Sequence, residues 1–330
     1  MSELFGRSLY VELADKDGIG EKFVARTMSN VDKNGNENKD GYDISFSVNK
    51  NQKKNPNESN LTIYGLEEET INKLEEELVY VTLYGGYGKD IKLISLGNIS
   101  KVKVSYSDAT TVVVISYQDG ARQYRESRVN KTYPAGTSYY SIIKDLASTM
   151  NYADPKVLDI DKTKTTSNSR TLSGSSAKYL REYCDKMGLS FSVQNNKMII
   201  KKDDSDINNT SEAFIISEDT GLVGSIEKNT VKLHKKYVSK RKKLKKPTAK
   251  SIASRNKSIA EASAKFNARQ YDKDHNIDFK VLLTPEIIPG SYLVIESKFN
   301  KPTYGIVKEL THSGSNFSDE WHTDIKIIVI

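Results

Sequence analysis

The sequence has little of the chemistry that builds disulfides and metal centres. Of its 330 residues, only Cys184 is a cysteine. A single cysteine excludes an intrachain disulfide and a cysteine-rich metal site. Cys184 stands at helical spacing from Leu180 and Met187, which predicts a buried thiol on the apolar face of a helix.

Histidine is scarce as well, and none of it stands in a metal-binding motif. The four histidines are His234, His275, His312 and His322. None has HExxH or Cys/His spacing. His312 and His322 lie ten positions apart on adjoining predicted strands with Asp319 and Asp324 nearby, so a shared zinc ion is one interpretation and two separately satisfied histidines the favoured one. We predict neither a metal nor a cofactor.

Long apolar runs and targeting signals are missing too. No stretch approaches the 18 apolar residues that a membrane-spanning helix needs, so we expect no membrane insertion by this chain. The first residues, MSELFGRSLY, lack the basic-then-apolar order of a signal peptide. We therefore expect assembly in a bacterial cytoplasm.

No motif of an enzyme is found. Ser173, Ser175 and Ser176 stand in no GxSxG sequence and fit the cap of a following helix better. The glycines of 85–88 precede a predicted strand and not a phosphate-binding helix. The acids of 67–69 and 75–77 fit the start and the solvated face of a helix better than a glycosidase pair. We therefore predict that the chain is not an enzyme.

The sequence is rich in strands at both ends. Alternating apolar residues mark strands from Leu9 onward, a polar stretch at 49–60 reads as a loop, and acids open a helix at about Glu67. In the last strand Thr323, Ile325, Ile327 and Val329 alternate with Asp324, Lys326, Ile328 and Ile330. These patterns predict β domains at 1–122 and 205–330.

The middle part, 123–204, predicts a small α+β domain. One helix should run from Tyr139 to about Met150, and a second should follow Ser175 and end at Gly188. A hairpin should turn at Asn195 and Asn196. The expected fold is therefore α+β and mainly β, with two tube-type β-barrel or sandwich domains flanking a small α+β domain.

The strongest feature of the composition is a basic insertion at 232–269 in the second β domain. It holds fourteen Lys and Arg and one acid, a net charge of +13, so the rest of this +7 chain sums to −6. The candidates for facing a polyanion such as DNA are Lys235, Lys236, Lys240, Arg241, Lys242, Lys243, Lys245 and Lys246.

What the insertion does has three interpretations. The bases can contact phosphates without reading sequence, although Tyr237 and Phe266 supply almost none of the aromatic residues of a single-strand binder. They can equally form a solvated basic loop. Third, Ile252, Ile259 and Phe266 recur every seven residues after Pro247 and predict a helix that packs on a partner or on other copies.

Five segments in this order resemble the baseplate hub, or tail hub, proteins of contractile-tailed bacteriophages, of the late-control type. They are YDISFSVNKNQKKNPNESNLTIYGL, ARQYRESRVNKTYPAGTSYYSIIKDLA, RTLSGSSAKYLREYCDKMGLSFSVQNNKMII, FIISEDTGLVGSIEK with LLTPEIIPGSYLVIES, and GIVKELTHSGSNFSDEWHTDI. They span most of the chain, and the basic insertion lies outside them.

The resemblance implies a structural protein of the virion tail without catalytic residues. Such hubs are homotrimers with two tube domains per chain, so six domains match the hexameric tail tube or its initiator, and the trimer matches a three-fold central spike. The resemblance also implies a channel for DNA ejection and contact with the tape-measure protein.

Two alternatives from other classes stay open. One is a nucleic-acid-binding protein that acts through the insertion, and the other is a tail-associated cell-wall hydrolase. On the hub interpretation, the bases of the insertion should line or cap the channel, where they meet DNA.

Overall fold

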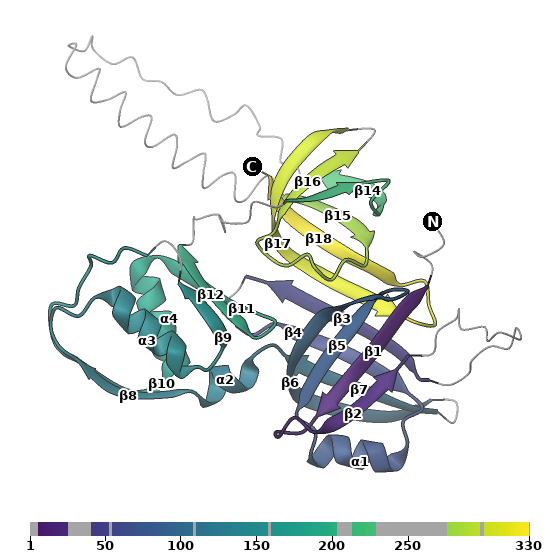
Figure 1. Cartoon of the computed structure of the whole chain (residues 1–330), viewed down its shortest axis with the longest axis horizontal. Helices are drawn as coiled ribbons and strands as arrows, with labels where there is room; N and C mark the ends of the chain where they lie inside the picture. Colours follow the sequence, from purple (N-terminus) through teal and green to yellow (C-terminus); the bar gives the residue numbers. More distant parts are fainter. Residues whose placement is uncertain are drawn as a thin grey trace, which may run out of the picture.

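The computed structural model describes residues 6–25, 41–52, 55–107, 110–157, 160–202, 213–228, 276–297 and 300–329. They form three units, each with its own cluster of buried hydrophobic residues. We name them the N-terminal β unit (6–118), the middle unit (121–202) and the C-terminal β unit (213–329). The middle unit lies to one side of the two β units (Figure 1).

The N-terminal β unit is a strongly curved antiparallel sheet around one core. Its elements are β1 (Arg7–Ala14), β2 (Gly20–Val24), β3 (Asp43–Asn51), β4 (Glu58–Tyr64), α1 (Glu68–Glu76), β5 (Tyr80–Tyr87), β6 (Asp90–Ser107) and β7 (Thr110–Gln118). The strands pair in the order β3-β4-β7-β6-β5-β1-β2. An isolated bridge from Ala25 to Tyr42 brings the two outer strands together, which makes the sheet barrel-like.

Alternation in the sequence decides which side of this sheet is inside. Leu9, Val11 and Leu13 are buried and their neighbours are half-buried, because successive side chains of a strand point to opposite faces. The buried face of α1, with Ile71 and Leu74, packs into the same core.

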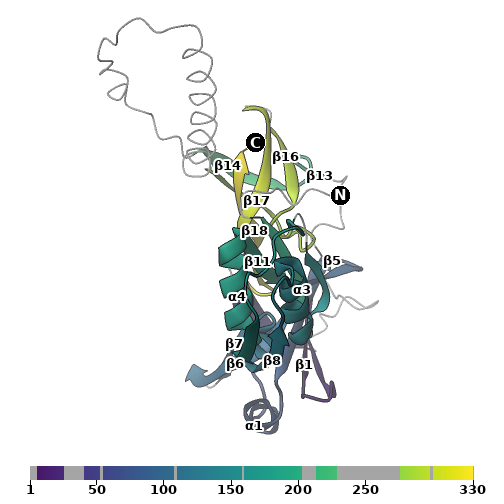
Figure 2. The ribbon, with the colours of Figure 1, turned by 90° about the vertical axis from the view of Figure 1, so that its left-hand side faces the viewer.

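The middle unit packs two helices on short strands. Its elements are α2 (Ala121–Glu126), β8 (Arg128–Tyr133), α3 (Tyr139–Thr149), β9 (Ala153–Val157), β10 (Arg170–Ser175), α4 (Ser176–Met187), β11 (Leu189–Gln194) and β12 (Lys197–Lys202). Figure 2 faces α3 and α4 from the side of this unit. Ser138 and Ser175 cap the two helices through their side chains, and Gly188 ends α4 in the left-handed conformation.

The C-terminal β unit is a six-stranded sheet. Its strands are β13 (Ala213–Ser217), β14 (Leu222–Lys228), β15 (Asn276–Leu282), β16 (Tyr292–Ser297), β17 (Asn300–Ser315) and β18 (Trp321–Val329). They pair in the order β14-β15-β18-β17-β16-β13, and only β13 and β16 run parallel. Val281, Val307 and Ile327 lie in its core.

The two β units share one sheet of thirteen strands. The C-terminal half of β17 pairs with β3 over Glu309–Ser315, with Val48 opposite His312. We call this ladder the β3–β17 seam. Trp321 and Leu283 of the C-terminal β unit also belong to the hydrophobic core of the N-terminal β unit. The β units are therefore joined through backbone pairing and through a shared core.

The predicted fold class, α+β and mainly β, is confirmed. Both predicted middle helices, the strands of both ends and the buried Cys184 are found. The predicted loop at 49–60 is wrong at both of its ends, since β3 continues to Asn51 and β4 begins at Glu58. Pairing of β3 with β17 buries Lys50 there, and pairing of β4 with β7 buries Ser59. The domain limits 1–122, 123–204 and 205–330 stay a prediction.

Candidate functional site

The basic insertion 232–269 lies outside the described residues, and with it all eight predicted polyanion-facing bases and the stripe Ile252, Ile259 and Phe266. The strands on either side of it are described. Glu227 pairs with Asp278, and Lys228 pairs with Ile277. The chain therefore leaves β14 and enters β15 at adjacent positions of one sheet, and the role of the bases stays a prediction.

The structure separates the two histidines that could have shared a zinc ion. His312 pairs with Thr323 and His322 pairs with Ser313, so the two imidazoles start from opposite faces of the β17–β18 ladder. His322 Nε2 lies 3.1 Å from Asp324 Oδ2, whereas His312 is fully buried. Within the described ranges, no group of three or more His, Cys, Asp and Glu side chains is arranged to hold a metal ion.

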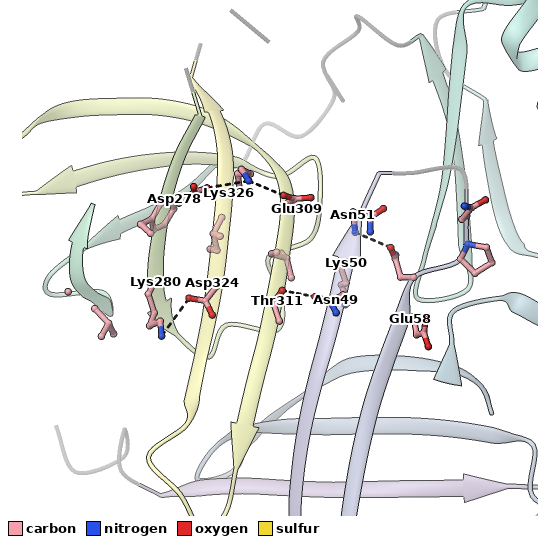
Figure 3. Close-up of a pocket in the computed structure, with 18 residues that line it drawn as sticks. Asn49, Lys50, Asn51, Glu58, Asp278, Lys280, Glu309, Thr311, Asp324 and Lys326 are labelled. Atoms are coloured by element: carbon pink, nitrogen blue, oxygen red, sulfur yellow. Dashed lines mark hydrogen bonds and ion pairs between the residues drawn. The ribbon is translucent and has the colours of Figure 1, made fainter. Parts of the chain in front are cut away.

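A groove of about 910 Å³ lies where the C-terminal β unit meets β3 and β4 (Figure 3). Four strands paired in the order β15-β18-β17-β3 carry most of its lining. The rest comes from β14, with Val223 and Gly224, from 55–57 of the β3–β4 connection and from Glu58 of β4. The groove thus exists only because the two β units share a sheet.

Charges of both signs alternate along this sheet face. The Lys326 ammonium lies 3.2 Å from Glu309 and 3.9 Å from Asp278. The hydrogen bond that Lys326 donates to Glu309 and the charge of Asp278 raise the pKa of Lys326. Lys280 lies 3.6 Å from Asp324 on the neighbouring strands. Because these carboxylates are paired with lysines, the groove suits contact with a polar macromolecular surface better than hydrolysis by a pair of carboxylates.

A buried polar junction fastens the middle unit to the N-terminal β unit. Lys50 is 3% exposed and donates from Nζ to Asn195 Oδ1 at 3.2 Å. Asp119 is 7% exposed, and its carboxylate accepts the backbone N–H of Asn195 at 2.5 Å and of Asn196 at 2.9 Å. The tip of the β11–β12 hairpin is therefore held by the carboxylate of Asp119 and the ammonium of Lys50.

Burial dominates the titration of this pair. It lowers the pKa of Lys50 to about 8, against the opposing attraction of Asp119. It also raises the pKa of Asp119, although the two backbone N–H donors and Lys50 oppose that shift. Each ionised form is disfavoured by lost water and supported by its partners in the junction.

Amide side chains extend the junction along the β3–β4 connection. Gln194 Nε2 donates to the carbonyl oxygen of Asn51 at 2.7 Å, and Asn57 Nδ2 donates to the carbonyl oxygen of Val193 at 3.3 Å. Asn57 Oδ1 in turn accepts the backbone N–H of Asn51 at 3.1 Å. These bonds satisfy buried backbone and side-chain groups, and they define the orientation of the middle unit.

A clasp at the opposite end of the seam joins β1 to the β17–β18 turn. Arg7 Nη1 donates to the carbonyl oxygens of Ser315 at 3.2 Å and Ser318 at 2.5 Å, and the guanidinium lies 5.7 Å from the Trp321 ring. Asn316 Oδ1 accepts the backbone N–H of Ile44 at 2.7 Å. The end of the seam at Ser315 is thus held by polar contacts.

Sequence reasoning did not identify the residues of the junction or the clasp. Lys50, Asp119, Arg7 and Asn316 are single polar residues in or beside strands, and neither their type nor their spacing distinguishes them. The only local signal was the Asn195-Asn196 turn, which is confirmed with φ of 51° and 59°. Its contact with Asp119 depends on residues 76 positions away.

No protein-family model matches this sequence, and no curated protein matches it. Solved structures do match the fold. The 43 kDa tail protein of prophage MuSo2 from Shewanella oneidensis aligns with a TM-score of 0.58 at 9% identity, over 98% of this chain and 97% of that one. The tail protein from Neisseria meningitidis MC58 aligns with a TM-score of 0.57 at 10% identity, over 98% and 96%.

A third structure links the fold to a related machine. It is an E. coli component of the type VI secretion system, described as structurally similar to the T4 bacteriophage tail proteins gp27 and gp5. It aligns with a TM-score of 0.54 at 10% identity, over 87% of this chain and 73% of that one.

The chain has the fold of phage tail proteins, and the resemblance predicted from the five segments is confirmed at that level. More particularly, the fold is shared over nearly the full length of two tail proteins and with a type VI secretion component. Identities near 10% establish the fold alone.

Proposed function

We propose that this chain is the hub subunit of a phage-type contractile tail, a structural protein of the tail baseplate in the virion. Three copies form a homotrimer that joins the six-fold tail tube to the three-fold central spike and surrounds part of the channel for DNA ejection. Its partners are the hexameric tube or tube-initiator protein, the trimeric spike and the tape-measure protein.

The observation that carries this proposal is the match over nearly the whole length of both tail proteins. A match of that extent includes both β units and the middle unit, and not a single common domain. The shared thirteen-stranded sheet supports it further, because two β units held in one sheet present a constant spacing to a partner.

Symmetry gives the physical reason for two β units per chain. A closed ring with six-fold spacing can be built from three chains only if each chain supplies two units that contact the ring. The same three chains present a three-fold axis to a spike. The seam with its clasp at Arg7 joins the two β units, and the buried junction joins the middle unit to them, so the units of one chain are held in a single arrangement, as an adaptor requires.

The proposal is tested by mass in solution. Light scattering of the purified full-length chain should give three times the 37.1 kDa chain mass, either alone or, with its trimeric spike protein present, in addition to the mass of the spike. A chain that remains a monomer at every concentration and with the spike present contradicts the hub assignment. Release of peptidoglycan by the pure chain would favour the hydrolase alternative, and we expect none.

A further inference from the structure

His312 lies at the centre of the β3–β17 seam and takes no part in the proposed assembly function. It is 0% exposed, on β17, opposite Val48 of β3 on one side and Thr323 of β18 on the other. A fully buried imidazole at a boundary between two units is sensitive to protonation, because the charged form must remain without water for as long as the boundary is closed.

The hydrogen bonds of His312 suit the neutral ring only. Nδ1 lies 2.8 Å from Thr323 Oγ1, and that oxygen also accepts the backbone N–H of Thr284 at 3.2 Å. Nε2 has no hydrogen-bond partner among the described residues. A protonated ring has two N–H donors, so its Nε2 proton would be buried without an acceptor.

The charges around the ring make protonation less favourable still. Lys50, on the same inward face of β3 two residues from Val48, is a buried cation that acts on His312. Asp119 is the carboxylate nearest to Lys50 in the buried junction, and the hairpin N–H groups already occupy it. Asp324 starts from the opposite face, beside His322. Burial and Lys50 together hold the pKa of His312 well below its ordinary value of 6.5.

We propose that the β3–β17 seam is an acid-responsive joint, in which protonation of His312 opens the ladder and releases the C-terminal β unit from the N-terminal β unit. In the opened seam the imidazolium is hydrated and lies farther from Lys50. The middle unit stays attached, because Lys50 of β3 and Asp119, which directly follows β7, hold the hairpin tip.

The direction of the effect follows from proton binding. With the seam open, His312 binds a proton near pH 6.5, whereas with the seam closed it does so only at lower pH. The contribution of His312 to the stability of the closed seam is therefore complete above pH 6.5 and is lost as the pH falls. One proton taken up on opening raises the opening equilibrium constant about fivefold from pH 6.5 to 5.5 and by up to about tenfold per unit below that, as long as the closed form stays unprotonated. Asp119 also titrates in the neighbouring junction, so the comparison must be made between variants.

Hydrogen exchange of the full-length chain tests the joint directly. Amide protection of 45–51 and 309–315, corrected for the intrinsic rate, should fall about fivefold between pH 6.5 and 5.5. Protection of the α3 and α4 helices should not follow it. The emission of Trp321, the only tryptophan, should shift to longer wavelength in step, because its ring lies in the core of the N-terminal β unit.

The matched variants are His312→Asn, which keeps a polar group near Thr323 but does not titrate, and His322→Asn on the other face. The first should abolish the pH dependence of seam protection, and the second should leave it unchanged. A slope that survives in His312→Asn, a slope lost in His322→Asn, or seam protection in the native chain that is constant from pH 7.5 to 5.5 overturns the proposal.

A measurement on the native chain covers the case in which His312→Asn does not fold. Exchange of the imidazole C2 proton, followed by mass spectrometry against pH, reports the titration of each histidine. The exchange midpoint of His312 should lie below 6.5, and its rate below that in the urea-unfolded chain. A midpoint at 6.5 or above overturns the proposal.

Discussion

Lys50 and Asp119 show how much of this molecule depends on single polar side chains. Removing a charge from water costs several kcal/mol unless partners replace the water. Here an amide oxygen and two backbone N–H groups act as those partners. Loss of one partner leaves the other charge buried, so the junction can orient the middle unit only while it is complete.

We predict that Asn196→Gly is more stable than Asn196→Ala at the tip of the β11–β12 hairpin. Asn196 has φ of 59°, in the left-handed region that disfavours residues with a Cβ. Asn196→Ala and Asn196→Gly both lose the side-chain contact with Gln123 Nε2. Because only alanine adds strain, the glycine variant should be more stable by about 1 kcal/mol in urea unfolding.

Equal stabilities of the two variants would contradict a strained turn at Asn196. The same pair substituted at Ser190 of β11, where the backbone is an ordinary strand, should reverse the order, since glycine costs entropy there. If the order of stability reverses at Ser190, the difference at Asn196 comes from its positive φ and not from a general preference of the middle unit for glycine over alanine.

The residue scale is also where sequence reasoning had least success. The Asn195-Asn196 turn was predictable, because asparagine tolerates positive φ and the flanking residues alternate. The polar run around Lys50 predicts a loop, because no local feature indicates that a lysine between two asparagines is buried. Its burial depends on pairing with Leu310, 260 positions further along the chain.

Strand β17 is the element that organises the two β units. Its N-terminal half pairs with β16, its middle with β18, and its C-terminal half with both β18 and β3. A register shift between Val307 and Glu309 accompanies the change of partner. A bulge of this kind bends a strand, which allows one strand to serve two cores.

At the element scale we predict that a residue of β18 controls the stability of the N-terminal β unit. Trp321 is 3% exposed and packs edge-to-face on Phe46 and Tyr87. Trp321→Ala removes this ring from the shared core and should lower the free energy of unfolding by about 3–5 kcal/mol. Hydrogen exchange should show the loss in β1 and β5, not only in β18.

Phe317 supplies the control for this prediction. It lies four residues before Trp321, is 43% exposed and contacts Tyr64 edge-to-face. Phe317→Ala should cost less than about 1 kcal/mol, because a half-exposed ring leaves little cavity. If Trp321→Ala destabilises only the C-terminal β unit, the two β units do not share a core in solution.

Helices and strands in which apolar residues recur at regular spacing are predictable from the sequence, whereas short polar ones are not. The two long middle helices follow from their apolar stripes and their caps. The helix α2 and the strand β8 have few buried residues of their own and were missed. They form because Ala121 and Val129 meet a core assembled from other elements.

The positive charge of this protein is concentrated in the basic insertion at 232–269. Away from the basic insertion the chain sums to −6, and the insertion carries +13. Three copies in a hub would concentrate nearly forty positive charges. We propose that these charges contact DNA in the channel, and this proposal can fail without affecting the hub assignment.

Deletion of 232–269 tests the insertion. The remaining residues 229–231 and 270–275 suffice to connect β14 and β15, whose ends are adjacent. The variant should fold and form trimers, and its affinity for duplex DNA should fall by at least about tenfold at 50 mM salt, with a shallower salt dependence. Fluorescence anisotropy with labelled DNA measures both quantities.

The matched control for the deletion is Lys101→Gln with Lys103→Gln, which removes exposed charge from β6. This variant should retain nearly full affinity for DNA. Equal DNA binding by the deletion variant and the full-length chain would remove the DNA-facing role of the insertion. A deletion variant that fails to form trimers while the full-length chain does would favour the seven-residue stripe as the contact between copies.

The sequence by itself determined the mainly β class, the position of both long helices, the burial of Cys184 and the likeness to tail proteins. These follow from local periods, caps and turns, which act over a few residues. Only the tertiary structure decided that β3 and β17 pair, that Trp321 joins a distant core and that Lys50 and His312 are buried together. Those facts depend on long-range strand pairing, whose free energy comes from burial that no short window of sequence contains.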